Sequence, residues 1–267
     1  MQMKKIIALF VCIVTLSLLL LAGNAAAYNA AFTHTDYQGS AMPTLDGKYT
    51  TNAEYSAGAS LGFGTDGVFR DIWASSGNVF ENFILETMDT TDDATDSYTI
   101  CYDSNADGGS TPKTDDFKIV ITGHGASATV AWFKGTGTAW ATAATPAATI
   151  FDFKESLATS PTSSTPHYMV EAKVDKQDTT AFGAVIIGME FGMRIAYTDA
   201  STGTTQAWPP APATADNPDG WGYVPYSMEP VPESLSTVII LALSSFAVVA
   251  GAVLIKKPKT IALKFNR

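Results

Sequence analysis

The chain is poor in the residues that build most metal and redox sites. It has only 2 cysteines and 3 histidines among 267 residues. Cys12 lies in an N-terminal apolar run, which leaves Cys101 alone in the rest of the chain, where no disulfide can form. A lone cysteine on an expected strand is most simply a small buried apolar residue. The scattered histidines, His34, His124 and His167, do not follow the H-x-x-H or C-x-x-C spacing of zinc sites.

Basic residues are scarce between the two ends of the chain. Residues 36–233 carry all 26 Asp and Glu but only 9 of the 16 Lys and Arg, which gives this segment a formal charge of −17. Such a surface repels phosphate backbones, so we expect no nucleic-acid partner. An acidic surface also suits solubility in salty surroundings and attracts divalent cations.

Long apolar runs occur only at the two ends. Lys4 and Lys5 precede an apolar run over residues 6–22, and small residues follow at 25–27. This order predicts a secretory signal peptide over residues 1–27, with an uncleaved membrane anchor as the alternative. We therefore expect the protein to be exported.

The second apolar run covers residues 235–255, 21 residues without a charge, and a basic tail follows at 256–267. It is long enough to form a transmembrane helix, and the basic flank places the tail in the cytoplasm and the preceding domain outside. A short Pro-rich linker, residues 227–234, contains Pro232 and Glu233. Together these three parts resemble the PEP-CTERM sorting signals of bacteria and their archaeal PEF-CTERM-like relatives. The resemblance implies processing by an exosortase or archaeosortase near Pro232 and Glu233; plain single-span anchoring is the alternative.

The middle of the chain has the alternating pattern of half-buried strands. Tyr98, Ile100 and Tyr102 alternate with small or polar residues before a loop, and Phe117 and Ile119 do so after it. Further strands are expected at 68–73, 79–87, 128–133, 150–153, 168–174, 184–190 and 193–197. This spacing favours an all-β, jelly-roll-like antiparallel β-sandwich over residues 44–226. We expect residues 28–43 to be mobile and residues 158–166 to be a solvated loop.

The loop between the two central strands is rich in oxygen ligands. Asp103, Asn105, Asp107 and Gly108 occupy the positions of the first half of a calcium loop. Thr114 stands where an EF-hand would have its last Glu, so Asp115 and Asp116 join Asp103, Asn105 and Asp107 as candidate metal ligands. The sequence predicts a bound calcium ion here, with a solvated Asx-rich turn as the alternative.

Several short motifs then occur in an order typical of one family. They are Leu45-Asp46-Gly47, Glu54-Tyr55-x-Ala57, the loop at 102–108 with Asp115-Asp116, the segment 188–199, Trp208, and 219–223. Residues 44–226 thereby resemble the family 9 carbohydrate-binding modules and the related DOMON-type sandwiches, although Tyr55 stands where the family usually has Trp. The resemblance implies a jelly roll that binds sugar in some relatives and haem in others, often with structural calcium.

Sugar binding requires aromatic faces beside polar groups. Trp140 is the first candidate, because it lies in a Gly/Thr/Ala-rich stretch with little core of its own. Trp132, Trp73 and Arg70 are further candidates. We predict a non-catalytic cell-surface domain that binds an extracellular or cell-surface polysaccharide, since the G-x-S-x-G and S-x-x-K matches occur in turn sequence rather than in the settings these motifs need.

Two alternatives from other classes remain at this stage. One is a structural or adhesive surface module that binds no sugar. The other is a haem b electron-transfer domain of the DOMON type, for which the resemblance implies axial Met and His ligands, or Met and Lys ligands. The candidate ligands are Met88, Met169, Met189 and Met193, with His124 or His167.

Overall fold

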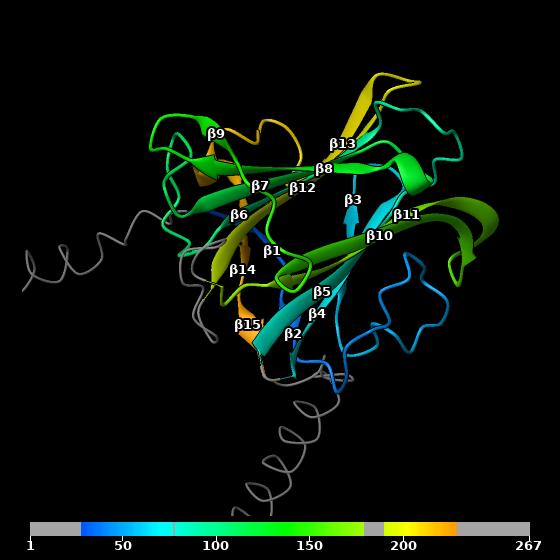
Figure 1. Ribbon diagram of the computed structural model, residues 1–267. Coiled ribbons are helices and arrows are strands. Elements are labelled where there is room, and N and C mark those ends of the chain that lie inside the picture. The colour runs from blue at the N-terminus through cyan, green and yellow to red at the C-terminus, as the bar shows by residue number, and fades with distance from the viewer. Residues whose placement is uncertain (1–27, 77, 179–189, 229–267) are drawn as a thin grey trace, which may run out of the picture. The chain divides into compact units, whose positions relative to one another are not determined.

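A computed structural model describes residues 28–76, 78–178 and 190–228 (Figure 1). Within these ranges the chain forms 15 strands and two 3-10 turns, Gly125–Ser127 and Pro218–Gly220. None of the helical segments in these ranges is long and apolar enough to cross a bilayer. The all-β class predicted from the sequence is confirmed.

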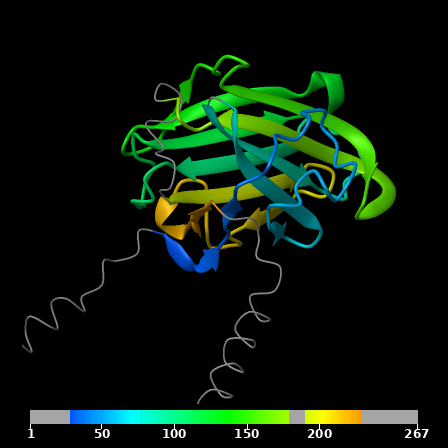
Figure 2. The same ribbon diagram turned by 90° about the horizontal axis from the view of Figure 1, so that it is seen from below.

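The strands form two main sheets that face each other as a sandwich (Figures 1 and 2). The larger sheet contains, in spatial order, β1 (Asn29–Thr33), β14 (Gly222–Val224), β12 (Phe191–Asp199), β6 (Ser97–Asp103), β7 (Asp116–Thr122), β8 (Thr129–Gly135) and β9 (Trp140–Ala143), while β13 (Thr204–Trp208) also pairs with β12. The smaller sheet contains β10 (Phe151–Ser160), β11 (Ser163–Asp175), β5 (Asn78–Glu86), β4 (Gly67–Ser76) and β3 (Ser60–Phe63). A short parallel pair, β15 (Tyr226–Ser227) and β2 (Asp36–Tyr37), completes the described structure.

The central hairpin β6–β7 carries the middle of the core, as the alternation predicts. Ile100 pairs with Ile119 and Tyr102 with Phe117, and all four side chains are buried between the sheets. Each such burial contributes roughly 1.5–3 kcal/mol. The intervening residues of β6 face outward, and Cys101 among them is a free, fully buried thiol, as expected.

Two expectations about irregular segments are wrong. Residues 158–166 are not a loop, because β10 extends to Ser160, β11 begins at Ser163, and only two residues make the turn. The hydroxyl groups of Ser160 and Thr162 donate to the buried carboxylate of Glu86, which holds this Ser/Thr-rich tip on the domain. The N-terminal segment also contributes strands, since β1 pairs with β14 and β2 with β15.

Several predictions concern residues outside the described ranges. These are the signal peptide over 1–27, most of the strand expected at 184–190, the sorting residues Pro232 and Glu233, the transmembrane helix over 235–255 and the basic tail. They stay predictions.

Candidate functional site

The acidic loop, residues 103–116, connects β6 to β7, and its first and last residues are paired across the hairpin. The carboxylate of Asp103 organises the loop by accepting hydrogen bonds from the backbone N–H of Gly108 at 2.7 Å and of Asn105 and Asp107 at 3.3 Å each. The backbone must turn sharply here, and Ala106 and Gly108 adopt positive φ values of 52° and 58°. The Asx-rich pattern therefore builds a tight loop that presents carboxylates inward.

Three carboxylates converge at the base of this loop. Asp103, Asp115 and Asp116 each offer an oxygen within 4.8 Å of the others. Asp115 Oδ2 and Asp116 Oδ1 are buried and have no hydrogen-bond partner among the described residues. Burial raises the pKa of Asp103 to about 6 and that of Asp116 to about 8, and the neighbouring carboxylates add to both shifts. Buried oxygens without donors, crowded by like charge, are the ligand set that a hard cation prefers.

The other two predicted metal ligands have different partners. The Asn105 side chain is exposed and accepts a hydrogen bond from the Asp107 N–H at 2.9 Å. The Asp107 carboxylate pairs with Lys113 Nζ at 2.8 Å. Their contribution to the loop is to shape it, whereas Asp103, Asp115 and Asp116 form the cluster.

Trp140 lies on the outer face of the larger sheet and is half-buried. Its Nε1 donates to the carbonyl of Ala215 at 3.2 Å, and its ring is stacked on the buried Trp221 with a centroid distance of 6.4 Å. Gly135 is the cross-strand partner of Trp140, and Phe133 is that of the adjacent outward residue Thr142. Lys118 Nζ lies 4.8 Å from the ring centroids of both Phe133 and Trp140.

Trp132 points the opposite way, into the sandwich. It is 2% exposed and packs edge-on against Phe151 at 5.2 Å. Together with Lys134, Ile150 and the segment 143–147, it lines a cleft of about 310 Å³.

Trp73 and Arg70 do not lie together, because they are on opposite faces of β4. Trp73 is buried, donates to the Ser227 carbonyl at 2.9 Å and contacts Tyr226. Arg70 is buried on the outer face, where it pairs with Glu86 at 2.7 Å and covers the Tyr49 ring at 4.2 Å. Both side chains are engaged in packing the domain.

The candidate haem ligands are engaged elsewhere. Both ring nitrogens of His124 contact carboxylates, and those of His167 contact Glu86 at 2.9 Å and the Thr165 carbonyl at 2.8 Å. Met193 lies in the core between the sheets, whereas Met169 lies on the outer face of the smaller sheet. The described structure does not favour the haem alternative, and Met189 lies outside it.

Two buried clusters of ionisable side chains were missed in the sequence. The Lys176 cluster consists of His34, Asp36, Asp71, Glu81 and Lys176; the His124 cluster consists of Asp89, Asp96, His124 and Glu155. The members of each come from segments far apart in the chain. No local spacing could have announced them, since the sandwich topology alone brings them together.

In the Lys176 cluster a lysine side chain of the protein supplies the positive charge. Lys176 Nζ pairs with Glu81, lies 3.5 Å from Asp36, and is 3.7 Å from the Phe191 ring centroid. Burial alone would lower its pKa, but the carboxylates of Glu81 and Asp36 outweigh that effect and raise it. The lysine therefore stays charged and neutralises part of the cluster.

Comparison with known proteins gives matches only among solved structures. No protein-family profile and no curated protein matches the chain. A family 9 carbohydrate-binding module from Caldicellulosiruptor kristjanssonii, in complex with cellotriose, is 15% identical with a TM-score of 0.48, over 76% of this chain and 97% of that one. A family 9 module from the same organism, in complex with glucose, is 16% identical with a TM-score of 0.45, over 75% of this chain and 98% of that one. Scores and identities this low do not carry a ligand or a binding site over to this chain.

Proposed function

We propose that the β-sandwich is a non-catalytic domain that binds carbohydrate on the outer face of β8 and β9. The observation that carries this proposal is the group formed by Trp140, Phe133 and Lys118. Pyranose rings present apolar C–H faces edged by hydroxyl groups, so their sites combine aromatic surface with a few polar groups.

The group has both components on one face of the sheet. Trp140 and Phe133 are diagonal neighbours on adjacent strands, close enough for aromatic side chains to form a continuous surface. Lys118 Nζ lies over both rings, and the exposed Thr142 adds a hydroxyl group. The Trp140 ring is fixed in advance by Trp221 and the Ala215 carbonyl, which lowers the entropic cost of ordering it on binding.

Two other concave regions are less suited to a sugar. The cleft beside Trp132 is large enough for a sugar ring, but that tryptophan is 2% exposed and offers almost no surface for stacking. A larger hollow of about 590 Å³ is lined by small and polar residues with Met228, and no aromatic ring lines it. We therefore assign the sugar to the Trp140 face.

A glycan-array screen of the full chain, followed by titration with the best ligand, tests this assignment. We expect saturable binding that Trp140→Ala weakens about tenfold or more, because truncating a central aromatic anchor removes most of the contact. Lys134→Ala, in the Trp132 cleft, is the matched control and should bind normally. Loss of binding in the control alone would move the site to the cleft. An absence of any saturable binding, from a folded chain, would favour the structural surface module instead.

We also propose that the acidic loop holds a calcium ion through Asp103, Asp115 and Asp116. The support is the pair of buried oxygens without donors and the all-oxygen composition of the cluster. The ion would neutralise the carboxylates and brace the loop; its removal should loosen the loop without unfolding the core hairpin.

For location, we propose export through the signal peptide and anchoring by the segment 235–255, with the sandwich outside. Processing at Pro232 and Glu233 by an exosortase or archaeosortase belongs to the same proposal. Mass spectrometry of the protein isolated from its membrane would show whether the chain ends near Glu233 or retains the basic tail.

A further inference from the structure

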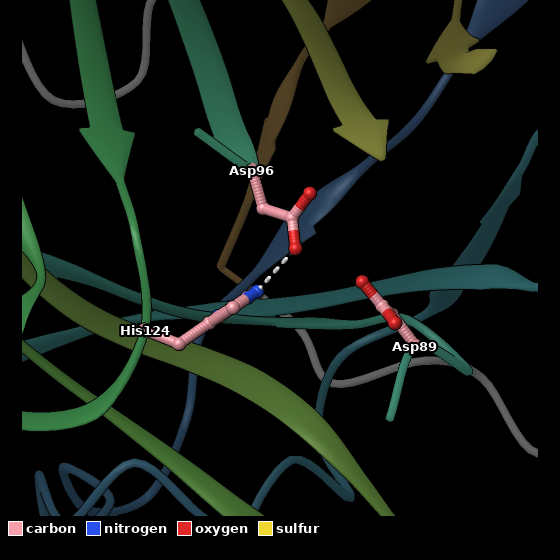
Figure 3. A group of neighbouring side chains, drawn as sticks. All are labelled: Asp89, Asp96 and His124. Carbon is pink, nitrogen blue, oxygen red and sulfur yellow. Dashed lines mark hydrogen bonds and ion pairs between the residues drawn. The ribbon is translucent and has the colours of Figure 1, made fainter. Parts of the chain in front are cut away.

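The His124 cluster lies at the end of the sandwich opposite the acidic loop. Asp89 follows β5, Asp96 directly precedes β6, and His124 follows β7, so three connections meet here (Figure 3). Asp96 directly precedes β6 and Asp103 is its last residue, so the strand separates the two regions by about 23 Å at the usual rise per residue. The two groups are therefore independent of each other.

The His124 ring is held in one orientation from behind. Its Nδ1 contacts Glu155 Oε1 at 2.7 Å, and its face is stacked on Tyr168 with a centroid distance of 3.7 Å and an interplanar angle of 11°. The side chain is fully buried. A carboxylate behind one ring nitrogen is the arrangement that fixes the tautomer of a metal-binding histidine and leaves the other nitrogen free to coordinate.

The other nitrogen, Nε2, points at two carboxylates. It lies 2.8 Å from Asp96 Oδ2, and Asp89, Asp96 and His124 each offer one ligand atom within 4.8 Å of the other two. In the neutral tautomer, where Nδ1–H donates a hydrogen bond to Glu155, Nε2 and Asp96 Oδ2 both present lone pairs, and a cation between them would satisfy both. Figure 3 shows the imidazole and the two carboxylates directed toward one another.

The charges of the cluster are unbalanced. Three carboxylates surround a single imidazole, and in the ranges that the structure describes only His124 forms ion pairs with Asp96 and Glu155. Asp89 instead accepts hydrogen bonds from neutral groups, the Tyr197 hydroxyl and Thr91. Even a protonated His124 leaves the cluster with excess negative charge. In the Lys176 cluster, by contrast, a buried ammonium group fills the corresponding role.

We propose that Asp89, Asp96 and His124 bind a divalent transition-metal ion of the zinc type, with Glu155 orienting the histidine. One imidazole nitrogen and two carboxylate oxygens form a mixed set that suits zinc, whereas calcium prefers oxygen ligands alone. Asp89 is the half-buried member and lies on the side from which the ion enters. The ion displaces the proton between His124 and Asp96 and ties together the loops after β5 and β7.

Equilibrium dialysis of the full chain against Zn²⁺ at neutral pH tests the proposal, with Co²⁺ absorption as a probe of a nitrogen-containing site. We expect Asp89→Asn to weaken Zn²⁺ binding at least tenfold, since the amide keeps the size of the side chain but loses its charge. Glu155→Gln, which alters only the orienting group, should weaken binding about 10- to 100-fold. Asp92→Asn is the matched control, because Asp92 is an exposed neighbour outside the cluster, and it should bind like wild type.

Circular dichroism of each variant keeps the test decisive. If Glu155→Gln fails to fold, Asp89→Asn still decides, because its half-buried carboxylate can be replaced without opening the core. Unchanged Zn²⁺ binding in a folded Asp89→Asn variant overturns the proposal. So does a folded wild-type chain without a Zn²⁺ site, which would leave an imidazolium held between Asp96 and Glu155.

Discussion

The two buried clusters of the sandwich solve the same electrostatic problem in different ways. In the Lys176 cluster, two fully buried carboxylates, Asp36 and Glu81, share the ammonium group of Lys176, and the third, Asp71, contacts His34. In the His124 cluster and the acidic loop, three carboxylates each lie together without a lysine or arginine paired to the cluster's buried members in the described structure. Burying charge is costly unless it is compensated. A buried acidic cluster whose compensating cation is a side chain of the protein is therefore a structural cluster. A cluster without such a side chain is a candidate site for a metal ion.

The largest expected effect comes from removing the internal cation. Lys176→Met keeps an apolar stem of similar length but leaves Asp36 and Glu81 buried without their partner, so we expect a loss of about 3–5 kcal/mol in the free energy of unfolding. Urea denaturation measures it. Lys173→Met is the control, since Lys173 is partly exposed over the Phe80 ring and should change stability by less than about 1 kcal/mol. A loss equal to that of the control would show that Lys176 is not the compensating charge.

Calcium should stabilise the folded chain by binding at the acidic loop, and it should not bind at the Lys176 cluster. With free calcium at about 100 times its Kd, binding to the folded chain alone stabilises it by about 2.7 kcal/mol. Asp116→Asn should remove this gain, which thermal denaturation with calcium and with a chelator would measure. Asp107→Asn is the matched control, because its carboxylate pairs with Lys113, and it should keep most of the gain. The reverse result would mean that calcium is bound by Asp107 and not by Asp116.

The pH dependence of stability tests the protonation of Asp36 within the Lys176 cluster. Burial and the nearby Asp71 raise the pKa of Asp36 well above its usual value. An acid with a raised pKa in the folded chain stabilises it below about pH 4, and this contribution is lost as pH rises through the folded value. The unfolding free energy of wild type should therefore fall relative to Asp36→Asn between pH 4 and neutrality, by at most about 1.4 kcal/mol per pH unit.

Denaturation curves for wild type, Asp36→Asn and the exposed-site control Asp92→Asn over this range would measure the difference. We expect Asp92→Asn to follow wild type. Parallel pH profiles for wild type and Asp36→Asn would contradict the raised pKa of Asp36.

The smallest effect is expected from giving the His124 cluster a cation of its own. Asp89→Lys places an ammonium group at the half-buried side of the cluster, where it can reach both Asp96 and solvent. We expect the stability without metal to fall by about 1 kcal/mol, because the buried Tyr197 hydroxyl loses its acceptor, while the stabilisation by Zn²⁺ disappears. Differential scanning calorimetry with and without Zn²⁺ would check this. If Zn²⁺ still stabilises this variant, the ion does not bind at the His124 cluster.

The sequence predicts the local parts of the structure well and the assembled sites poorly. Alternation at Tyr98, Ile100 and Tyr102 was enough to identify β6 and its inward face, because strand periodicity is a local property. The acidic loop was also visible, since its carboxylates lie within 14 residues of chain. The tip of the β10–β11 hairpin was mistaken for a loop because its Ser and Thr residues are held by Glu86, a partner on another strand.

The clusters could not be predicted for the same reason. The fold of the two sheets brings together His124, Asp96 and Glu155. The position of one histidine in the sequence does not predict which carboxylates will contact it. Trp140 shows the intermediate case. Its poor local packing marked it as a surface candidate, but Phe133 and Lys118 became its neighbours only through the register of β7, β8 and β9.

The most direct measurement is the metal content of the full chain after dialysis against Ca²⁺ and Zn²⁺ together, for wild type, Asp116→Asn and Asp89→Asn. We expect one calcium and one zinc ion in wild type, loss of calcium alone in Asp116→Asn, and loss of zinc alone in Asp89→Asn. A folded wild-type chain that retains neither ion, or variants that retain both, would contradict this expectation.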